Sequence, residues 1–193
     1  MKSFRILFLL PCLLFADVAE DDSYQWRYRI SASASSHLKE QGKPADKYDA
    51  DKVIDGSVAT AWCASTANAT DGVGESIQLQ FRARQLKQIH LVNGYAASRS
   101  LYFANNRIKK ARLEITSSTG RSFTTTVNFS EKCSSSTASA PCAISLADYQ
   151  VARFKETCAE KIDVTILEVY PGKQHHDTCI AEIALQDDAT FCN

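Results

Sequence analysis

Apolar and polar side chains alternate along several stretches of the chain, and residues that favour turns separate these stretches. A period of two places every second side chain on the same face, which predicts a half-buried β-strand. A more continuous apolar run at residues 86–92 predicts a central strand. The alternating stretches are residues 24–30, 77–81, 111–115, 123–129 and 162–166.

Turn signals are frequent, whereas helical periodicity is weak. Residues 118–121, Ser-Thr-Gly-Arg, separate two predicted strands and predict a hairpin. Residues 146–158 are compatible with a short helix, although their apolar side chains do not keep to one face. Many short strands with frequent turns predict an all-β fold, either an antiparallel β-sandwich or a jelly roll.

The first residues have the features of a secretory signal peptide. Two basic residues precede an apolar run at residues 6–15, and a small residue, Ala16, follows at a suitable cleavage point. The run is too short to span a bilayer, so export is favoured over anchoring. We expect residues 1–16 to be removed and residues 17–193 to form a single domain. Acylation of Cys12 is the alternative, which the preceding proline disfavours.

The charge balance excludes some classes of partner. The whole chain has 22 lysines and arginines and 22 aspartates and glutamates. Removal of Lys2 and Arg5 with the signal peptide leaves 20 basic against 22 acidic residues, a net charge of about −2. We therefore expect no attraction to nucleic acid or to an anionic membrane. No later segment is apolar enough to cross a membrane, so we expect no transmembrane anchor and a secreted, periplasmic or cell-surface location.

Six cysteines remain after removal of residues 1–16. An even number of cysteines in an exported chain predicts disulfides, and the absence of a Cys-x-x-Cys pair disfavours a zinc site. A local bridge across residues 133–142 would hold a tract rich in serine, threonine and alanine. Several connectivities are possible, and we favour the pairs Cys63–Cys179, Cys133–Cys142 and Cys158–Cys192.

An Asp-Gly turn begins at Asp55, and Thr60, Trp62 and Cys63 follow it closely. The oxygens of Asp55 and Thr60 are suitable ligands for a hard cation such as Ca²⁺. The alternative is a simple turn in which Thr60 caps the backbone. Residues 177–183 have a matching character, with a cysteine, flanking acids and an apolar strand. We expect Trp62 to pack in the core.

Residues 93–107 form a polar and aromatic segment after a predicted strand. Amides, arginine and aromatic rings are the groups that hydrogen-bond to sugars and stack on them, and loops on a rigid scaffold carry such sites. The alternative is a structural loop in which asparagines satisfy backbone groups and Arg107 pairs with an acid. The candidate binding residues in this segment are Tyr95, Arg99, Tyr102 and Asn105.

The cluster His175-His176-Asp177 is the one group that resembles a catalytic site. Adjacent side chains on a strand point to opposite faces, so the two histidines are poorly placed to act on one ligand. An exposed loop is the favoured interpretation. The sequence contains neither a Gly-x-Ser-x-Gly elbow nor a His-Glu-x-x-His motif, so an enzyme is not expected.

The run from Asp55 to Trp62 resembles the signature of the discoidin, or coagulation-factor type C, superfamily of galactose-binding-like jelly rolls. Further motifs occur in the order expected for one branch, the NAD-glycohydrolase translocation domain, also called the NADase-type glycan-binding domain, of bacterial exported proteins. This resemblance extends over roughly residues 28–187. The motifs are residues 74–77, 92–95, 105–109, 169–172 and 177–183.

The resemblance implies an eight-stranded antiparallel jelly roll whose loops at one end form a ligand face. It implies glycan binding rather than turnover, and the NAD-hydrolysing domain that gives the branch its name is not expected in this chain. It also implies a structural Ca²⁺ bound by the side chains of Asp55 and Thr60, the carbonyl of Ser57, and Glu182. The insert between Cys133 and Cys142 departs from the branch.

We therefore expect a non-catalytic module that binds a glycan or glycoprotein. One alternative is an interaction or adhesion module that binds a host or envelope protein through the same loops. A second alternative is a hydrolase that uses His175 or Asp177. The expected ligand-binding residues are Tyr95, Arg99, Tyr102, Asn105, His175 and His176.

Overall fold

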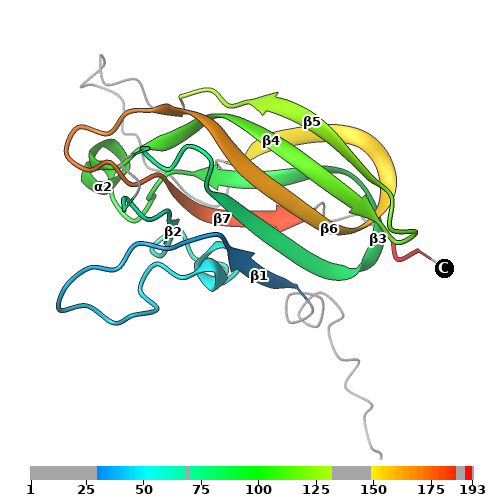
Figure 1. The fold of residues 1–193 in the computed structure, drawn as a ribbon, viewed down its shortest axis with the longest axis horizontal. Coiled ribbons are helices and arrows are strands. Elements are labelled where there is room, and N and C mark those ends of the chain that lie inside the picture. The colour runs from blue at the N-terminus through cyan, green and yellow to red at the C-terminus, as the bar shows by residue number, and fades with distance from the viewer. Residues whose placement is uncertain (1–29, 68–69, 132–148, 186–189, 193) are drawn as a thin grey trace, which may run out of the picture.

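The computed structural model describes residues 30–67, 70–131, 149–185 and 190–192 (Figure 1). The predicted signal peptide and the alternation over residues 24–29 lie outside this part. Two short helices occur within these described ranges, the 3-10 helix η1 (Ala50–Val53) and α2 (Arg99–Ala104). The strands are β1 (Ser31–Ala34), β2 (Trp62–Cys63), β3 (Ser76–Asn93), β4 (Arg107–Ser117), β5 (Ser122–Asn128), β6 (Gln150–Tyr170) and β7 (Cys179–Leu185).

The two longest strands, β3 and β6, pair with each other along most of their length, with register shifts after Gln80 and after Leu86. Bulges of this kind bend strands and increase their twist. Residues 77–80 of β3 also pair with β1, and residues 89–93 pair with β7. The β3–β6 pair therefore continues from one layer of the fold into the other.

One layer contains β1, the first part of β3, the last part of β6, β4 and β5. The second contains β2, β7, the rest of β3 and the beginning of β6, and the described strands all pair antiparallel (Figure 1). Ile77 and Leu113 from the first layer share one buried core with Leu91 and Ile183 from the second. This arrangement confirms the predicted all-β antiparallel sandwich.

The predicted strands at residues 77–81 and 86–92 form one continuous strand, β3. The predicted hairpin is present, because Gly120 N donates to Ser117 O at 2.8 Å between β4 and β5. For the described residues, the prediction of a helix at residues 146–158 is wrong. Residues 150–158 belong to β6, which pairs with β3. The described residues hold seven strands rather than eight, because β3 and β6 each pass through both layers.

Among the described residues, two disulfides tie the strands together. Cys63 on β2 bonds to Cys179 at the start of β7, and Cys158 on β6 bonds to Cys192 near the C-terminus. Both predicted pairs are confirmed, whereas Cys133 and Cys142 lie outside the described residues. Trp62 is fully buried as expected, and its Nε1 donates to a backbone carbonyl at 2.8 Å. None of the helices in the described residues is both long and apolar enough to cross a bilayer.

Candidate functional site

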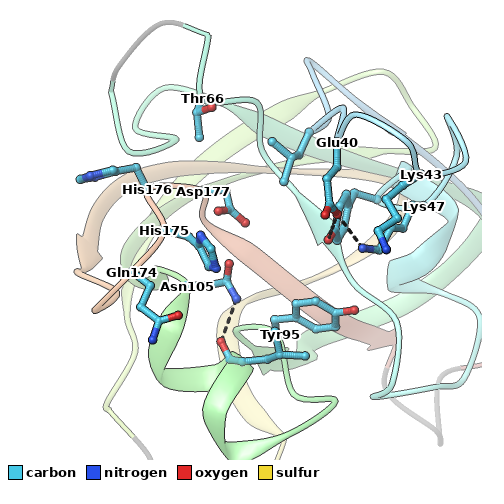
Figure 2. A pocket seen from close by; sticks show the side chains of 13 residues that line it. Glu40, Lys43, Lys47, Thr66, Tyr95, Asn105, Gln174, His175, His176 and Asp177 are labelled. Atoms are coloured by element: carbon cyan, nitrogen blue, oxygen red, sulfur yellow. Dashed lines mark hydrogen bonds and ion pairs between the residues drawn. The ribbon is translucent and has the colours of Figure 1, made fainter.

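A hollow of about 550 Å³ lies at the end of the sandwich where β7 begins, and we call it the Tyr95 pocket (Figure 2). This volume lies within the usual range for small-molecule sites, about 300–1,000 Å³. The walls come from separate segments: the β1–η1 loop, Thr66, the end of β3, α2, and the loop before β7. The lining residues are Leu38, Glu40, Lys43, Lys47, Tyr48, Thr66, Tyr95, Leu101, Asn105, Gln174, His175, His176 and Asp177.

The wall formed by α2 is fixed at both ends of the helix. The hydroxyl of Ser98 accepts from Leu101 N at 3.2 Å, which is the usual N-cap hydrogen bond. At the other end, Asn105 Nδ2 donates to Leu101 O at 2.8 Å. Gly94 precedes Tyr95 with φ of +97°, and a Cβ there would lie 2.6 Å from Arg107 Cγ. Only glycine fits this turn without strain, so the turn sets the direction of Tyr95.

The wall formed by the loop before β7 is held by Asn106. Its Nδ2 donates to His176 O at 2.9 Å, and its Oδ1 accepts from Gly172 N at 2.6 Å. Its backbone N–H donates to Asp177 O at 2.9 Å. Asn106 therefore satisfies backbone groups, and Arg107 pairs with Glu131, as the structural interpretation of this segment expects.

The opposite wall contains a compact polar group that the sequence analysis missed. Glu40 Oε2 accepts from Lys47 Nζ at 2.7 Å and from Tyr48 OH at 2.9 Å. The hydrogen bond from Lys47, and then that from Tyr48, lowers the pKa of the Glu40 carboxyl. Tyr48 also contacts Tyr95 edge to face, with ring centroids 6.2 Å apart. No periodic pattern marks this irregular loop, so the fold alone brings these residues to the site.

The floor of the pocket holds the carboxyl group of Asp177, which is only 5% exposed. Burial raises the pKa of Asp177, while its own backbone N–H and the nearby His175 and His176 act in the opposite direction. Figure 2 shows His175 pointing into the pocket and His176 pointing away from it. His176 is 83% exposed and its Nδ1 lies 2.9 Å from Asp71 Oδ1.

The structure brings four of the six expected binding residues to the pocket, namely Tyr95, Asn105, His175 and His176. Arg99 is exposed on α2 outside the lining, with its guanidinium 5.2 Å from the Phe103 ring centroid.

Tyr102 is a correction to the expected set. It is 1% exposed and packs beneath Gly94, with the guanidinium of Arg107 5.2 Å from its ring centroid. The inward face of α2 carries this side chain, so its ring offers no surface to a ligand. Sequence alone did not separate the two faces of so short a helix.

The expected cation ligands also lie together. Asp55 Oδ2 accepts from Thr60 Oγ1 at 2.7 Å, and Thr60 Oγ1 lies 3.2 Å from the carbonyl oxygen of Ser57. Glu182 on β7 is 5% exposed, and its Oε2 accepts from Gly56 N at 3.0 Å. Two carboxylates, a hydroxyl and a carbonyl around one tight loop fit the oxygen ligands that Ca²⁺ prefers.

Known proteins share the sequence pattern and the fold. Residues 23–186 match the family described as the NAD glycohydrolase translocation F5/8 type C domain. A search by sequence among curated proteins finds no match.

Solved structures show the same architecture. The family 32 CBM from C. perfringens NanJ in complex with galactose has a TM-score of 0.56 and 18% identity, over 83% of this chain and 95% of that one. The C-terminal domain of a chitobiase from Bacteroides fragilis has a TM-score of 0.59 and 17% identity, over 87% and 98%. A putative chitobiase fragment from Bacteroides thetaiotaomicron has a TM-score of 0.65 and 11% identity, over 87% and 93%. At these identities the similarity shows the fold.

Proposed function

Because the chain belongs to the NAD glycohydrolase translocation F5/8 type C domain family, we propose that it is an exported, non-catalytic module that binds a glycan in the Tyr95 pocket. The observation that carries this proposal is the composition of that pocket. The ring of Tyr95 and the side chains of Leu38 and Leu101 line it together with amide, imidazole and carboxyl groups. Sugars present C–H faces to aromatic rings and hydroxyl groups to polar side chains, so this mixture suits them.

The relatives support the same proposal. Carbohydrate-binding modules occur among the proteins of this fold, and the NanJ module is in complex with galactose. The two disulfides and the basic, then apolar, N-terminal sequence support export to a secreted or cell-surface location. The pocket is open rather than enclosed, so we expect weak monovalent affinity, with a Kd on the order of 0.1–1 mM.

We propose further that Ca²⁺ has a structural role at the loop of Asp55, Ser57 and Thr60, with Glu182 as the fourth ligand. The oxygen atoms described above support this assignment. A bound ion would fix the loop against β7 and would not take part in sugar chemistry.

The test is a glycan array followed by calorimetric titration of the best sugar. We expect Tyr95→Ala to weaken binding about tenfold or more, because the loss of one stacking ring removes on the order of 1–2 kcal/mol. Phe191→Ala is the matched control, since Phe191 is an exposed aromatic that contacts Arg82 and Arg84, away from the pocket.

Sugar-independent binding of a host or envelope protein, unaffected by free sugars, would instead support the interaction-module alternative. Turnover of a substrate that depends on His175 would support the hydrolase alternative.

A further inference from the structure

The carboxyl group of Asp177 is buried without a cationic partner. Its Oδ2 lies 3.2 Å from Cys179 Sγ, but this sulfur is bonded to Cys63 and has no hydrogen to donate. Within the part of the chain that the structure describes, Asp177 forms no ion pair. Its own backbone N–H and the nearby imidazoles of His175 and His176 offset only part of the cost of burial. The carboxylate therefore keeps capacity to accept further hydrogen bonds.

The second acid of the pocket is in the opposite situation. Glu40 already receives hydrogen bonds from Lys47 and Tyr48. The two acids therefore differ in what they can offer to a ligand. Glu40 shapes the wall, whereas Asp177 retains acceptor capacity and faces the pocket from its floor (Figure 2).

We propose that Asp177 is the residue that selects the ligand, by accepting hydrogen bonds from two adjacent hydroxyl groups of a neutral sugar. This inference rests on the proposed glycan function and adds the chemical feature that is recognised. A carboxylate has two acceptor oxygens, and a vicinal diol presents two donors at a matching separation. A ligand of this kind supplies further hydrogen bonds to the carboxylate when it enters.

Acidic ligands fit less well. A sugar carboxylate would place a second negative charge beside the desolvated carboxyl of Asp177, which costs free energy in a poorly hydrated site. Neutral hydroxyl donors avoid this penalty.

The proposal also implies a pH dependence of binding. Hydroxyl donors stabilise the ionised carboxylate, while burial raises the pKa of Asp177 in the free protein. Affinity should therefore fall as the pH falls through that pKa. The other titratable groups of the pocket are Glu40, Lys43, Lys47, Tyr48, Tyr95, His175 and His176. These groups remain in an Asp177→Asn variant, so the difference between the two pH profiles isolates Asp177.

The experiment is titration calorimetry with three neutral probes: methyl β-galactoside, methyl α-mannoside and the methyl glycoside of N-acetylglucosamine. Asp177→Asn should weaken binding of the best probe about 10- to 100-fold at neutral pH, the usual effect of losing hydrogen bonds to a charged group. The affinity of Asp177→Asn should not show the fall at acid pH that the wild-type protein shows, which we call the acid limb. Glu40→Gln is the matched acid control and should retain that limb, because Asp177 is still present.

Monodeoxy analogues of the best probe keep the test independent of any variant. Two adjacent deoxy positions should each weaken binding to the wild-type protein, and neither should weaken binding to Asp177→Asn further. If a probe binds but Asp177→Asn and all deoxy analogues leave the Kd within about twofold, this proposal is overturned while the glycan function stands. If none of the three probes binds and the array is also blank, the proposed function fails and this proposal fails with it.

Discussion

The buried carboxyl of Asp177 should make the protein less stable when it ionises, even without a ligand. Burial raises the pKa of this group, so the folded protein holds its proton to a higher pH than the unfolded chain does. Stability is therefore lost as the pH rises from the unfolded pKa through the folded one. Asp177→Asn removes the charge and keeps the shape of the side chain, so it should stabilise the protein at neutral pH.

The size of the effect follows from the contacts. The group is 5% exposed, and a buried polar group that lacks all of its partners costs about 1–3 kcal/mol. The backbone N–H of Asp177 and the nearby histidines offset part of this cost. We therefore expect Asp177→Asn to gain about 1–2 kcal/mol at neutral pH, and to gain little at a pH below the unfolded pKa. For a protein of this size that corresponds to a rise in Tm of roughly 2–8 °C.

The assay is urea denaturation of both proteins across the acid to neutral range. Glu40→Gln provides a control of opposite sign, because Lys47 and Tyr48 lower the pKa of Glu40. The stability contributed by Glu40 is present above its unfolded pKa and is lost as the pH falls through the folded one. An Asp177→Asn variant that is less stable than the wild type at neutral pH would refute the reasoning. So would a difference in unfolding free energy between the two proteins that does not change with pH.

Two further predictions concern the Asp55 loop and the turn at Gly94. The wild-type Tm should be higher in calcium than in chelator, because a ligand that binds only the folded state stabilises it. Asp55→Ala should abolish this difference, whereas the control Asp51→Ala should keep it. A wild-type Tm that chelator leaves unchanged contradicts the calcium proposal. Gly94→Ala should cost about 1–3 kcal/mol in urea denaturation, because its Cβ would lie 2.6 Å from Arg107 Cγ. Gly42→Ala, with φ of +78° but open space around it, should cost less, and an equal loss would contradict the packing argument.

Much of the fold follows from local pattern. The alternation at residues 111–115 and 162–166 reflects strands with one buried face, and the structure places both in the sandwich. The helix considered for residues 146–158 failed where the chain is described because pairing with β3 outweighs local preference there. The joining of residues 77–92 into one bent strand depends on two bulges, which no periodic pattern reveals.

The site was predictable only in part. Tyr95 and Asn105 carry suitable chemistry and lie in one segment, so the sequence analysis included them, and both line the pocket. Tyr102 has the same chemistry but faces the interior, since a six-residue helix has too few positions to define its buried face from sequence. Glu40 and Tyr48 lie in an irregular loop that is distant from Tyr95 in the sequence, and only the tertiary fold brings them to Tyr95.

The central claim is that a sugar binds in the Tyr95 pocket. The most direct test is a titration of the ¹⁵N-labelled protein with the best sugar from the array, in which NMR records the amide chemical shifts at each sugar concentration. We predict that shifts concentrate at Tyr95, Asn105, His175 and Asp177, and that Arg112 on β4 remains unchanged. Saturating shifts confined to another surface, with these pocket amides unmoved, would contradict the account.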